Sequence, residues 1–365
     1  RSVFDRTEEM AALEIPLIRL HDASIQVPLP LIDVPCVFPL FHQDAADPRN
    51  YLFAPSDDYI ANALKTGGKI MYRLGVSIEH SVNKYNTKPP EDYDKWADIC
   101  CRIIEHYNEG WANGFHHGIE YWEIWNEANV GPSMWAGSWA DYVRFYVTTA
   151  KRIKARFPDL KIGGPSLAGD PPHLIRSLLE ACRAHHAPLD FFSWHIYSNH
   201  PRFIYDSPYA VRGLLDEYGF SNTELHLDEW HYNPEFDGWA DRQAYTAKGD
   251  AMCGADSAAF ATAVLSGFQD TPVTMAYFYT LVDYNSLYRL FHPVTRCPEK
   301  TYHALLAFNR LTKYEHRVAV STEGSDNIWV LAGSKPDGSC AALISCFRDA
   351  KDGRDLEITF AGKAL

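Results

Sequence analysis

Two short segments of this sequence carry carboxylates in a setting that could do chemistry. Residues 125–127 read Trp-Asn-Glu and residues 228–230 read Asp-Glu-Trp, and each segment follows an apolar run. Glu127 and Glu229 are 102 positions apart (229 − 127). Two carboxyl groups that face each other can cleave a glycosidic bond: one protonates the leaving oxygen, and the other stabilises or attacks the anomeric carbon. Asn126 could then donate a hydrogen bond to the sugar 2-hydroxyl.

The elements that must position these groups alternate regularly between strand and helix. We expect helices at 5–13, 90–114, 138–157, 172–185, 207–218, 244–268 (broken at Gly254) and 300–311. We expect strands at 15–22, 69–75, 119–126, 161–165, 189–195, 223–229 and 273–280, whereas the Pro-rich stretch 28–55 is too irregular to assign. Strands that alternate with helices of this length indicate a parallel sheet with crossover helices.

Seven strands are one short of a closed barrel. We therefore predict an α/β fold, a (β/α)8 TIM barrel over residues 1–312, with its first strand upstream of residue 1. An open doubly wound sheet is the alternative, but no G-x-G-x-x-G follows an early strand. In a barrel the active groups lie at the carboxyl ends of strands, where both glutamates are expected.

The pattern changes after residue 312. Four short alternating runs at 317–322, 327–333, 341–347 and 356–360 are separated by turn residues and have no helix between them. Such a pattern is typical of antiparallel strands. We predict that residues 313–365 form a small accessory domain of β-sandwich-like strands.

Several segments, taken in order, resemble glycoside hydrolase family 39, a family of clan A retaining glycosidases that includes β-xylosidases and α-L-iduronidases. Residues 122–129 (Trp-Glu-Ile-Trp-Asn-Glu-Ala-Asn) are similar to its acid/base segment, and residues 229–230 to its nucleophile segment. Residues 161–165 also match, residues 190–197 resemble the sixth strand, and the Arg-Leu-His at 19–21 resembles the end of the second. The resemblance covers roughly residues 5–312.

The resemblance implies that Glu127 is the general acid/base and Glu229 the nucleophile of a double displacement, with carboxyl groups about 5–5.5 Å apart. Repulsion from ionised Glu229 would then raise the pKa of Glu127. Ala128 departs from the family, which usually has Pro there, and this puts the leaving-group loop in question. Asp228 competes for the nucleophile role. Strand alternation, which groups Glu229 with residues 225 and 227, favours Glu229.

Other polar and aromatic side chains at strand ends are candidates to bind the sugar. The substrate-binding candidates are His21, Asn126, His195, Tyr197, Trp230 and Tyr279. Trp135, Trp139 and Trp239 are further stacking candidates, and Asp283 and Asn285 could shape an adjoining subsite. His195 has an alternative as a buried core histidine. Glu123 is expected to pair with Arg19 or Arg73 inside the barrel.

Composition narrows the class of substrate and partner. The net charge is −13, so nucleic acid and anionic membrane are poor partners. No run approaches the roughly 20 apolar residues of a membrane span, and no signal-peptide pattern opens the chain. The 10 Trp, 21 Tyr and 19 Phe suit either a sugar-stacking surface or a large aromatic core. Without an obvious basic cluster, we expect an exo-β-glycosidase that acts on a neutral, xyloside- or galactoside-like sugar of an oligosaccharide or polysaccharide-derived substrate.

No cofactor or metal is expected. The eight cysteines contain no C-x-x-C pair, and the His pairs at 116–117 and 185–186 lack ligand spacing relative to a carboxylate. Disulfide pairing and oligomeric state stay open, and a periplasmic or secreted location is slightly favoured. Two other functions stay open: a non-catalytic carbohydrate-binding barrel, and an iduronidase-like enzyme on an acidic sugar. An aldolase or metal hydrolase would need a strand-end Lys or a His/Asp cluster, which the sequence does not show.

Overall fold

A computed structural model describes residues 5–21, 31–235, 242–281, 287–322 and 326–347. The chain divides into two compact units. Unit 1 comprises Arg1–Ile196, Ser207–Trp230 and Pro272–Phe278, and unit 2 comprises Tyr197–Asp206, His231–Thr271 and Tyr279–Leu365. This division runs through the predicted barrel sequence itself. It therefore does not test the boundary expected after residue 312, which stays a prediction.

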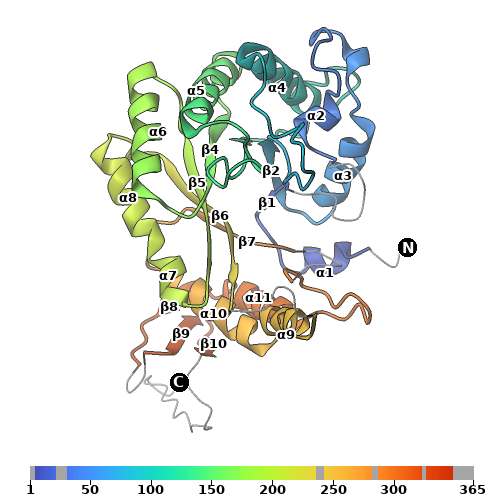
Figure 1. The fold of residues 1–365 in the computed structure, drawn as a ribbon. Coiled ribbons are helices and arrows are strands. Elements are labelled where there is room, and N and C mark those ends of the chain that lie inside the picture. The colour runs from blue at the N-terminus through green and yellow to red at the C-terminus, as the bar shows by residue number, and fades with distance from the viewer. Residues whose placement is uncertain (1–4, 22–30, 236–241, 282–286, 323–325, 348–365) are drawn as a thin grey trace. The chain divides into compact units, whose positions relative to one another are not determined.

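Seven strands form one sheet in which each strand neighbours the next one along the chain (Figure 1). They are β1 (Leu17–Arg19), β2 (Lys69–Leu74), β3 (Tyr121–Ile124), β4 (Lys161–Ala168), β5 (Phe191–Ser198), β6 (Glu224–Tyr232) and β7 (Met275–Phe278). The pairings recorded between them are parallel. All seven expected strands are present, and the predicted barrel fold with a small C-terminal β-sheet is confirmed. The placement of a further strand upstream of residue 1 stays a prediction.

The helices of unit 1 follow the expected alternation. They are α1 (Thr7–Ala11), α2 (Val34–Val37), α3 (Ala54–Leu64), α4 (Tyr93–Asn108), α5 (Trp139–Arg156), α6 (Pro172–His185) and α8 (Ser207–Glu217), with a 3-10 turn at Pro48–Asn50. Helix α5 begins in a capping box, in which Ser138 and Asp141 each accept a hydrogen bond from the other's backbone N–H. Helix α3 was missed because its first turn lies in the Pro-rich stretch; Pro55 fits there because the first turn needs no N–H donor at that position.

Unit 2 contains α7 (Pro201–Tyr205), α9 (Arg242–Cys253), α10 (Ala255–Phe268) and α11 (Lys300–Leu311). Gly254 separates α9 from α10, as expected. An antiparallel sheet follows, with β9 (Ile328–Ser334) between β8 (His316–Val318) and β10 (Cys340–Cys346). Three of the four C-terminal strands are therefore confirmed, and the fourth, at 356–360, lies outside the described residues.

The inward-facing residues of the barrel change character along each strand. Near the amino ends an apolar cluster contains Leu17, Met71, Phe191 and Tyr277. Alternate residues of a strand share a face, so Arg19, two residues after Leu17 on β1, points into the barrel on the same side as Leu17. The same step leads from Phe191 to a serine and then to a histidine on β5. The apolar layer thus supports a buried polar layer directly above it.

No single helix among the described residues is both long and apolar enough to cross a membrane; only the bent pair Thr246–Cys253 and Ala255–Phe268 passes that test together. All eight cysteines are free thiols.

Candidate active site

Arg19, at the end of β1, organises the buried polar layer. Its Nε lies 2.6 Å from Oε2 of Glu123 and 3.1 Å from Oδ2 of Asp228, and its Nη1 lies 2.9 Å from Oε1 of Glu229. The side chain is 4% exposed. Burial alone would lower the pKa of the guanidinium, but the three carboxylates raise it well above its usual value. One buried cation therefore faces three carboxyl groups from β3 and β6, and the predicted Arg19–Glu123 pair is confirmed.

The remaining nitrogen of Arg19 reaches two further groups. Nη2 donates to Oδ1 of Asn126 over 2.7 Å and to Oγ of Ser166 over 2.8 Å. Asn126 is 1% exposed, and its Oδ1 also accepts from the Ser166 hydroxyl over 3.0 Å. This arrangement leaves the Asn126 amide group as the donor that can face a sugar hydroxyl.

Glu229 lies between two histidines. Its Oε1, already paired with Arg19, is 3.5 Å from Nε2 of His21, and its Oε2 is 3.5 Å from Nδ1 of His195. The Glu229 side chain is 6% exposed. The two carboxylate oxygens therefore have different surroundings.

Glu127 follows β3 in a sharply turned backbone. Trp125 and Glu127 have φ values of 72° and 48°, in the left-handed region that side chains other than glycine seldom adopt. Gly75 makes room for this turn, since a Cβ there would lie 2.8 Å from the Trp125 Cα. A backbone hydrogen bond from Glu127 N to Ser166 O, 2.9 Å long, holds the turn against β4. The Glu127 side chain is 22% exposed, so it is open to solvent where Glu229 is nearly closed.

His195, on β5, joins the two glutamates. Its Nδ1 lies 2.8 Å from Oε1 of Glu127, and its Nε2 lies 2.7 Å from Oγ of Ser166 and 3.4 Å from Oδ1 of Asp228. One ligand atom each from Glu127, His195 and Glu229 lie within 4.8 Å of one another. The structure therefore brings both predicted catalytic residues together with the predicted His195.

The electrostatics correct one expectation. Burial favours a raised pKa for Glu127, but the hydrogen bond and charge of His195, with His21 and Arg19, lower it below its usual value. For His195, burial favours a lowered pKa, but the charges of Glu229 and Asp228 raise it well above the usual value. The expected upward shift of the Glu127 pKa was wrong, because His195, His21 and Arg19 together outweigh the effect of burial.

Behind these groups, the two buried carboxyl groups of Glu123 and Asp228 both lie against Nε of Arg19. Burial and the neighbouring Asp228 charge raise the pKa of Glu123 despite Arg19. The pKa of Asp228 is lowered instead: burial opposes the shift, but the charges of Arg19 and His195 dominate. Of these two carboxyl groups, Glu123 therefore takes up a proton more readily than Asp228.

Alternation along β6 does not separate Asp228 from Glu229, because both contact Arg19 and His195. The pairing of β6 with β7 shifts register between Leu227 and Trp230. Such an irregularity lets consecutive side chains point to the same face.

Sequence reasoning also missed Ser166, which lies in an apolar strand and belongs to no recognisable motif.

The remaining candidates for sugar binding lie in different parts of the chain. Trp230 is 1% exposed and packs edge-on against Phe278, with ring centroids 5.2 Å apart; its role in sugar binding stays a prediction. Tyr197 and Tyr279 belong to unit 2, where their rings lie 6.2 Å apart and each is 5.4 Å from the ring of Tyr288. Trp239, Asp283 and Asn285 lie outside the described residues.

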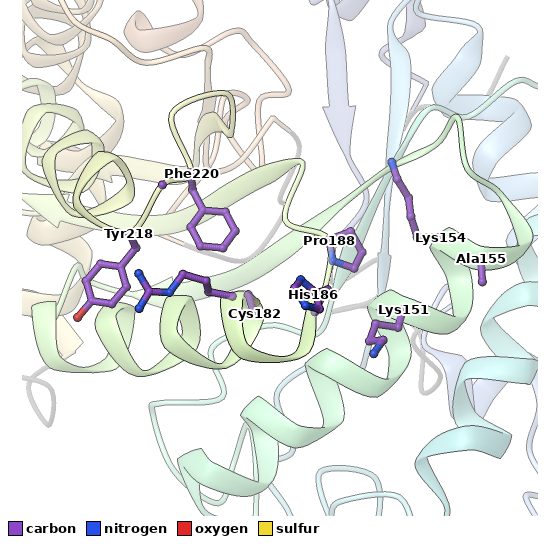
Figure 2. A pocket seen from close by; sticks show the side chains of 11 residues that line it. Lys151, Lys154, Ala155, Cys182, His186, Pro188, Tyr218 and Phe220 are labelled. Atoms are coloured by element: carbon purple, nitrogen blue, oxygen red, sulfur yellow. The ribbon is translucent and has the colours of Figure 1, made fainter.

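A surface hollow of about 730 Å³ lies elsewhere on unit 1 (Figure 2). It is lined by Lys151 and Lys154 near the end of α5, Cys182 near the end of α6, and Tyr218 and Phe220 after α8. Helices of a barrel end near the amino ends of the following strands, whereas the carboxylates lie at the carboxyl ends. The hollow is therefore separate from the candidate active site.

Comparison with known proteins agrees with this arrangement. The family model described as "Glycosyl hydrolases family 39" matches residues 71–318. A β-xylosidase of Geobacillus stearothermophilus is 27% identical over 261 residues, which are 62% of this chain and 48% of the relative. The chain thus spans about half the length of that curated relative.

Solved structures show the same fold. A glucosidase from Croceicoccus marinus superposes with a TM-score of 0.77 at 24% identity, covering 93% of this chain and 71% of that one. A family 39 β-xylosidase from Caulobacter crescentus gives a TM-score of 0.67 at 18% identity, covering 90% and 73%. The family match spans more than half of the sequence, and it includes Glu127 and Glu229. The chain therefore belongs to glycoside hydrolase family 39.

Proposed function

We propose that this chain is a retaining glycoside hydrolase that removes a neutral, β-linked, xylose-type sugar from the end of its substrate. The observation that carries the proposal is the meeting of Glu127 and Glu229 around His195, with ligand atoms within 4.8 Å, inside a family 39 barrel. Retaining enzymes need carboxyl groups about 5–5.5 Å apart, whereas inverting enzymes need about 6.5–9.5 Å to admit a water. The compact geometry supports the retaining mechanism.

Glu229 is the proposed nucleophile. Arg19 holds its Oε1 at 2.9 Å and balances its negative charge. The Oε2 atom, which lies 3.5 Å from Nδ1 of His195, attacks the anomeric carbon. The bond from that carbon to the leaving oxygen breaks as a glycosyl ester forms, and this ester is later hydrolysed by water.

Glu127 and His195 together supply the proton for the leaving oxygen. They share one proton along the 2.8 Å contact between His195 Nδ1 and Glu127 Oε1, and groups coupled so closely titrate as a pair. Transfer of that proton to Glu127 prepares it to protonate the glycosidic oxygen. Esterification of Glu229 then removes a charge that stabilises protonated His195. Glu127 can next accept a proton from the attacking water.

The charges around the pair favour a neutral sugar over an acidic one. Among the described residues there, Arg19, His21 and His195 each lie within 3.5 Å of a protein carboxylate. A sugar carboxylate would have to compete with these acidic groups for the same partners. The β-xylosidase relatives point the same way.

Three variants test the proposal on a panel of aryl glycosides. For Glu127→Ala, turnover of substrates with poor leaving groups should fall far more than turnover of activated aryl xylosides, and azide should restore the latter. Glu229→Ala should be inactive, and a 2-deoxy-2-fluoroxyloside should label a peptide containing Glu229 in the unaltered enzyme. The control is Glu217→Ala, a surface carboxylate paired with Arg176, which should act normally. Absence of sugar release from every glycoside, with sugars still bound, would favour the non-catalytic barrel.

A further inference from the structure

Glu127, His195 and Glu229 together have the composition of a zinc site. Two carboxylates and one imidazole, with a fourth position open, match the ligand number of sites in which zinc keeps a water or exchangeable ligand. The three ligand atoms lie within 4.8 Å of one another. From this geometry we propose that the pocket binds one zinc-like divalent cation and that the bound cation inhibits the enzyme.

The distances require only small movements. Zinc bonds of about 2.0–2.1 Å in a tetrahedron place ligand atoms roughly 3.4 Å apart. Nδ1 of His195 is 2.8 Å from Oε1 of Glu127 and 3.5 Å from Oε2 of Glu229. The widest pair must close by no more than about 1.4 Å from its 4.8 Å limit, a movement that the partly exposed Glu127 side chain can supply.

A second observation concerns the far side of the imidazole. Nε2 of His195 lies 3.4 Å from Oδ1 of Asp228 and 2.7 Å from Oγ of Ser166. Metal-bound histidines commonly use the non-ligating nitrogen in such a contact with a carboxylate, which fixes the ring and raises its basicity. Here the contact turns Nδ1 toward both glutamates. Oδ1 of Asp228 is buried and accepts no hydrogen bond from the residues that the structure describes, so it can strengthen this contact when a cation binds.

The same contacts specify which cation binds and how. Oε1 of Glu229 is paired with Arg19, so the ligand oxygen is Oε2, on the side of His195. An imidazole ligand favours zinc, copper or nickel over magnesium and calcium, which prefer oxygen alone. The cation reaches the site along the 22% exposed Glu127 side chain, and a water completes its coordination. On binding, the Nδ1 proton leaves to solvent.

Inhibition of the enzyme by zinc follows from the position of the ion, and this part of the inference rests on the proposed function. An ion held between Glu127 and Glu229 occupies the space that the anomeric carbon and the glycosidic oxygen need. Zinc and substrate therefore exclude each other, which predicts competitive inhibition.

The test uses the full chain, freed of metal by a chelator, and zinc chloride in a non-coordinating buffer. Equilibrium dialysis should find one zinc per chain at this site, and zinc should raise the KM for an aryl xyloside without lowering kcat. Glu127→Gln and His195→Asn should each weaken binding by at least about tenfold. Because Glu127 is partly exposed, its variant keeps the test decisive if His195→Asn fails to fold.

The matched control removes the exposed thiols, which also bind zinc. A Cys297→Ser/Cys340→Ser/Cys346→Ser variant, altered only at exposed cysteines, should retain the zinc. The inference is overturned if zinc binding persists unchanged in Glu127→Gln, disappears with the cysteines, or is absent at millimolar zinc. Zinc binding that depends on Glu127, in a protein that hydrolyses no glycoside, would support the metal site and refute the proposed function. A protein that hydrolyses glycosides but binds no zinc would support the proposed function and refute the metal site.

Discussion

Replacing Ser166 with alanine should damage catalysis more than folding. The hydroxyl lies within hydrogen-bonding distance of Arg19 (2.8 Å), His195 (2.7 Å), Asp228 (2.9 Å) and Asn126 (3.0 Å). Ser166 itself is completely buried. Its removal leaves these groups partly unsatisfied, which we expect to lower the free energy of unfolding by about 1–3 kcal/mol.

The effect on catalysis acts through the orientation of the imidazole. Without Ser166, Nε2 of His195 retains only the longer 3.4 Å contact with Asp228, so the ring and the Glu127 carboxyl that it contacts lose their fixed geometry. Misplacement by about 1 Å can cost about 100-fold in rate. We expect kcat/KM to fall by about 10- to 100-fold, with a larger loss on poor leaving groups because the effect reaches the acid.

Ser56→Ala is the matched control. Its hydroxyl is also buried, donating to Phe53 O and accepting from Tyr107, each over 2.8 Å, but it lies in α3. The assays are urea unfolding and kcat/KM on aryl xylosides of graded leaving-group quality. Both variants should lose similar stability, and only Ser166→Ala should lose activity at temperatures where both are folded. Equal activities, or a loss independent of the leaving group, would refute the positioning argument.

Three further predictions follow from the same structure. Gly75→Ala should lower the free energy of unfolding by about 1–3 kcal/mol and reduce activity, because the new Cβ would lie 2.8 Å from the backbone of the acid/base segment. The control is Gly213→Ala, whose Cβ would enter open space on α8. In urea unfolding this control should be neutral or stabilising. Asp228→Asn should lower the free energy of unfolding by about 3–5 kcal/mol, because it breaks a buried ion pair. Glu123→Gln resembles the protonated acid that the raised pKa of Glu123 favours, so its free energy of unfolding should stay close to that of the unaltered protein. The reverse order of stabilities would show that the charges are wrongly assigned. Hydrogen bonds, the strongest of them from a histidine, lower the pKa of Glu224 to about 2. The ionised Glu224 therefore stabilises the fold above the usual carboxyl pKa, and this stabilisation is lost as pH falls toward 2. Glu224→Gln should lack this loss in its acid-unfolding profile, and a profile equal to that of the unaltered protein would contradict the prediction.

The sequence predicted the barrel because short apolar strand segments alternate regularly with helical segments along the chain. The same logic could not find α3, whose start is surrounded by prolines and whose polar residues resemble a loop. It could not find Ser166 either, since this serine becomes important only through four partners, which come from β1, β5, β6 and the turn after β3.

The candidate metal ligands show a similar limit. A sequence search examines short spacings, and the histidine pairs at 116–117 and 185–186 fail it. The three ligands of the inferred site stand at positions 127, 195 and 229, which are 68 and 34 positions apart (195 − 127 and 229 − 195). They meet because parallel strands end at one face of a barrel.

The choice between Asp228 and Glu229 depends on an irregularity that strand alternation cannot reveal. His226 faces the barrel interior, where its ring stacks on Phe191 and its Nδ1 lies 3.0 Å from the Tyr277 hydroxyl. If side chains alternated strictly along β6, Asp228 would also point into the barrel and Glu229 would point out of it. This is the opposite of what we expected when we used alternation to favour Glu229.

The register shift before Trp230 brings Glu229 inward as well, and this gives the two carboxylates different environments. The side chain of Asp228 has no exposed surface and lies between Arg19 and His195. The side chain of Glu229 keeps 6% of its surface exposed and directs Oε2 toward His195, beside Glu127. Because a nucleophile must reach the sugar, the buried Asp228 is suited to balance charge, and Glu229 is left as the carboxylate that can attack.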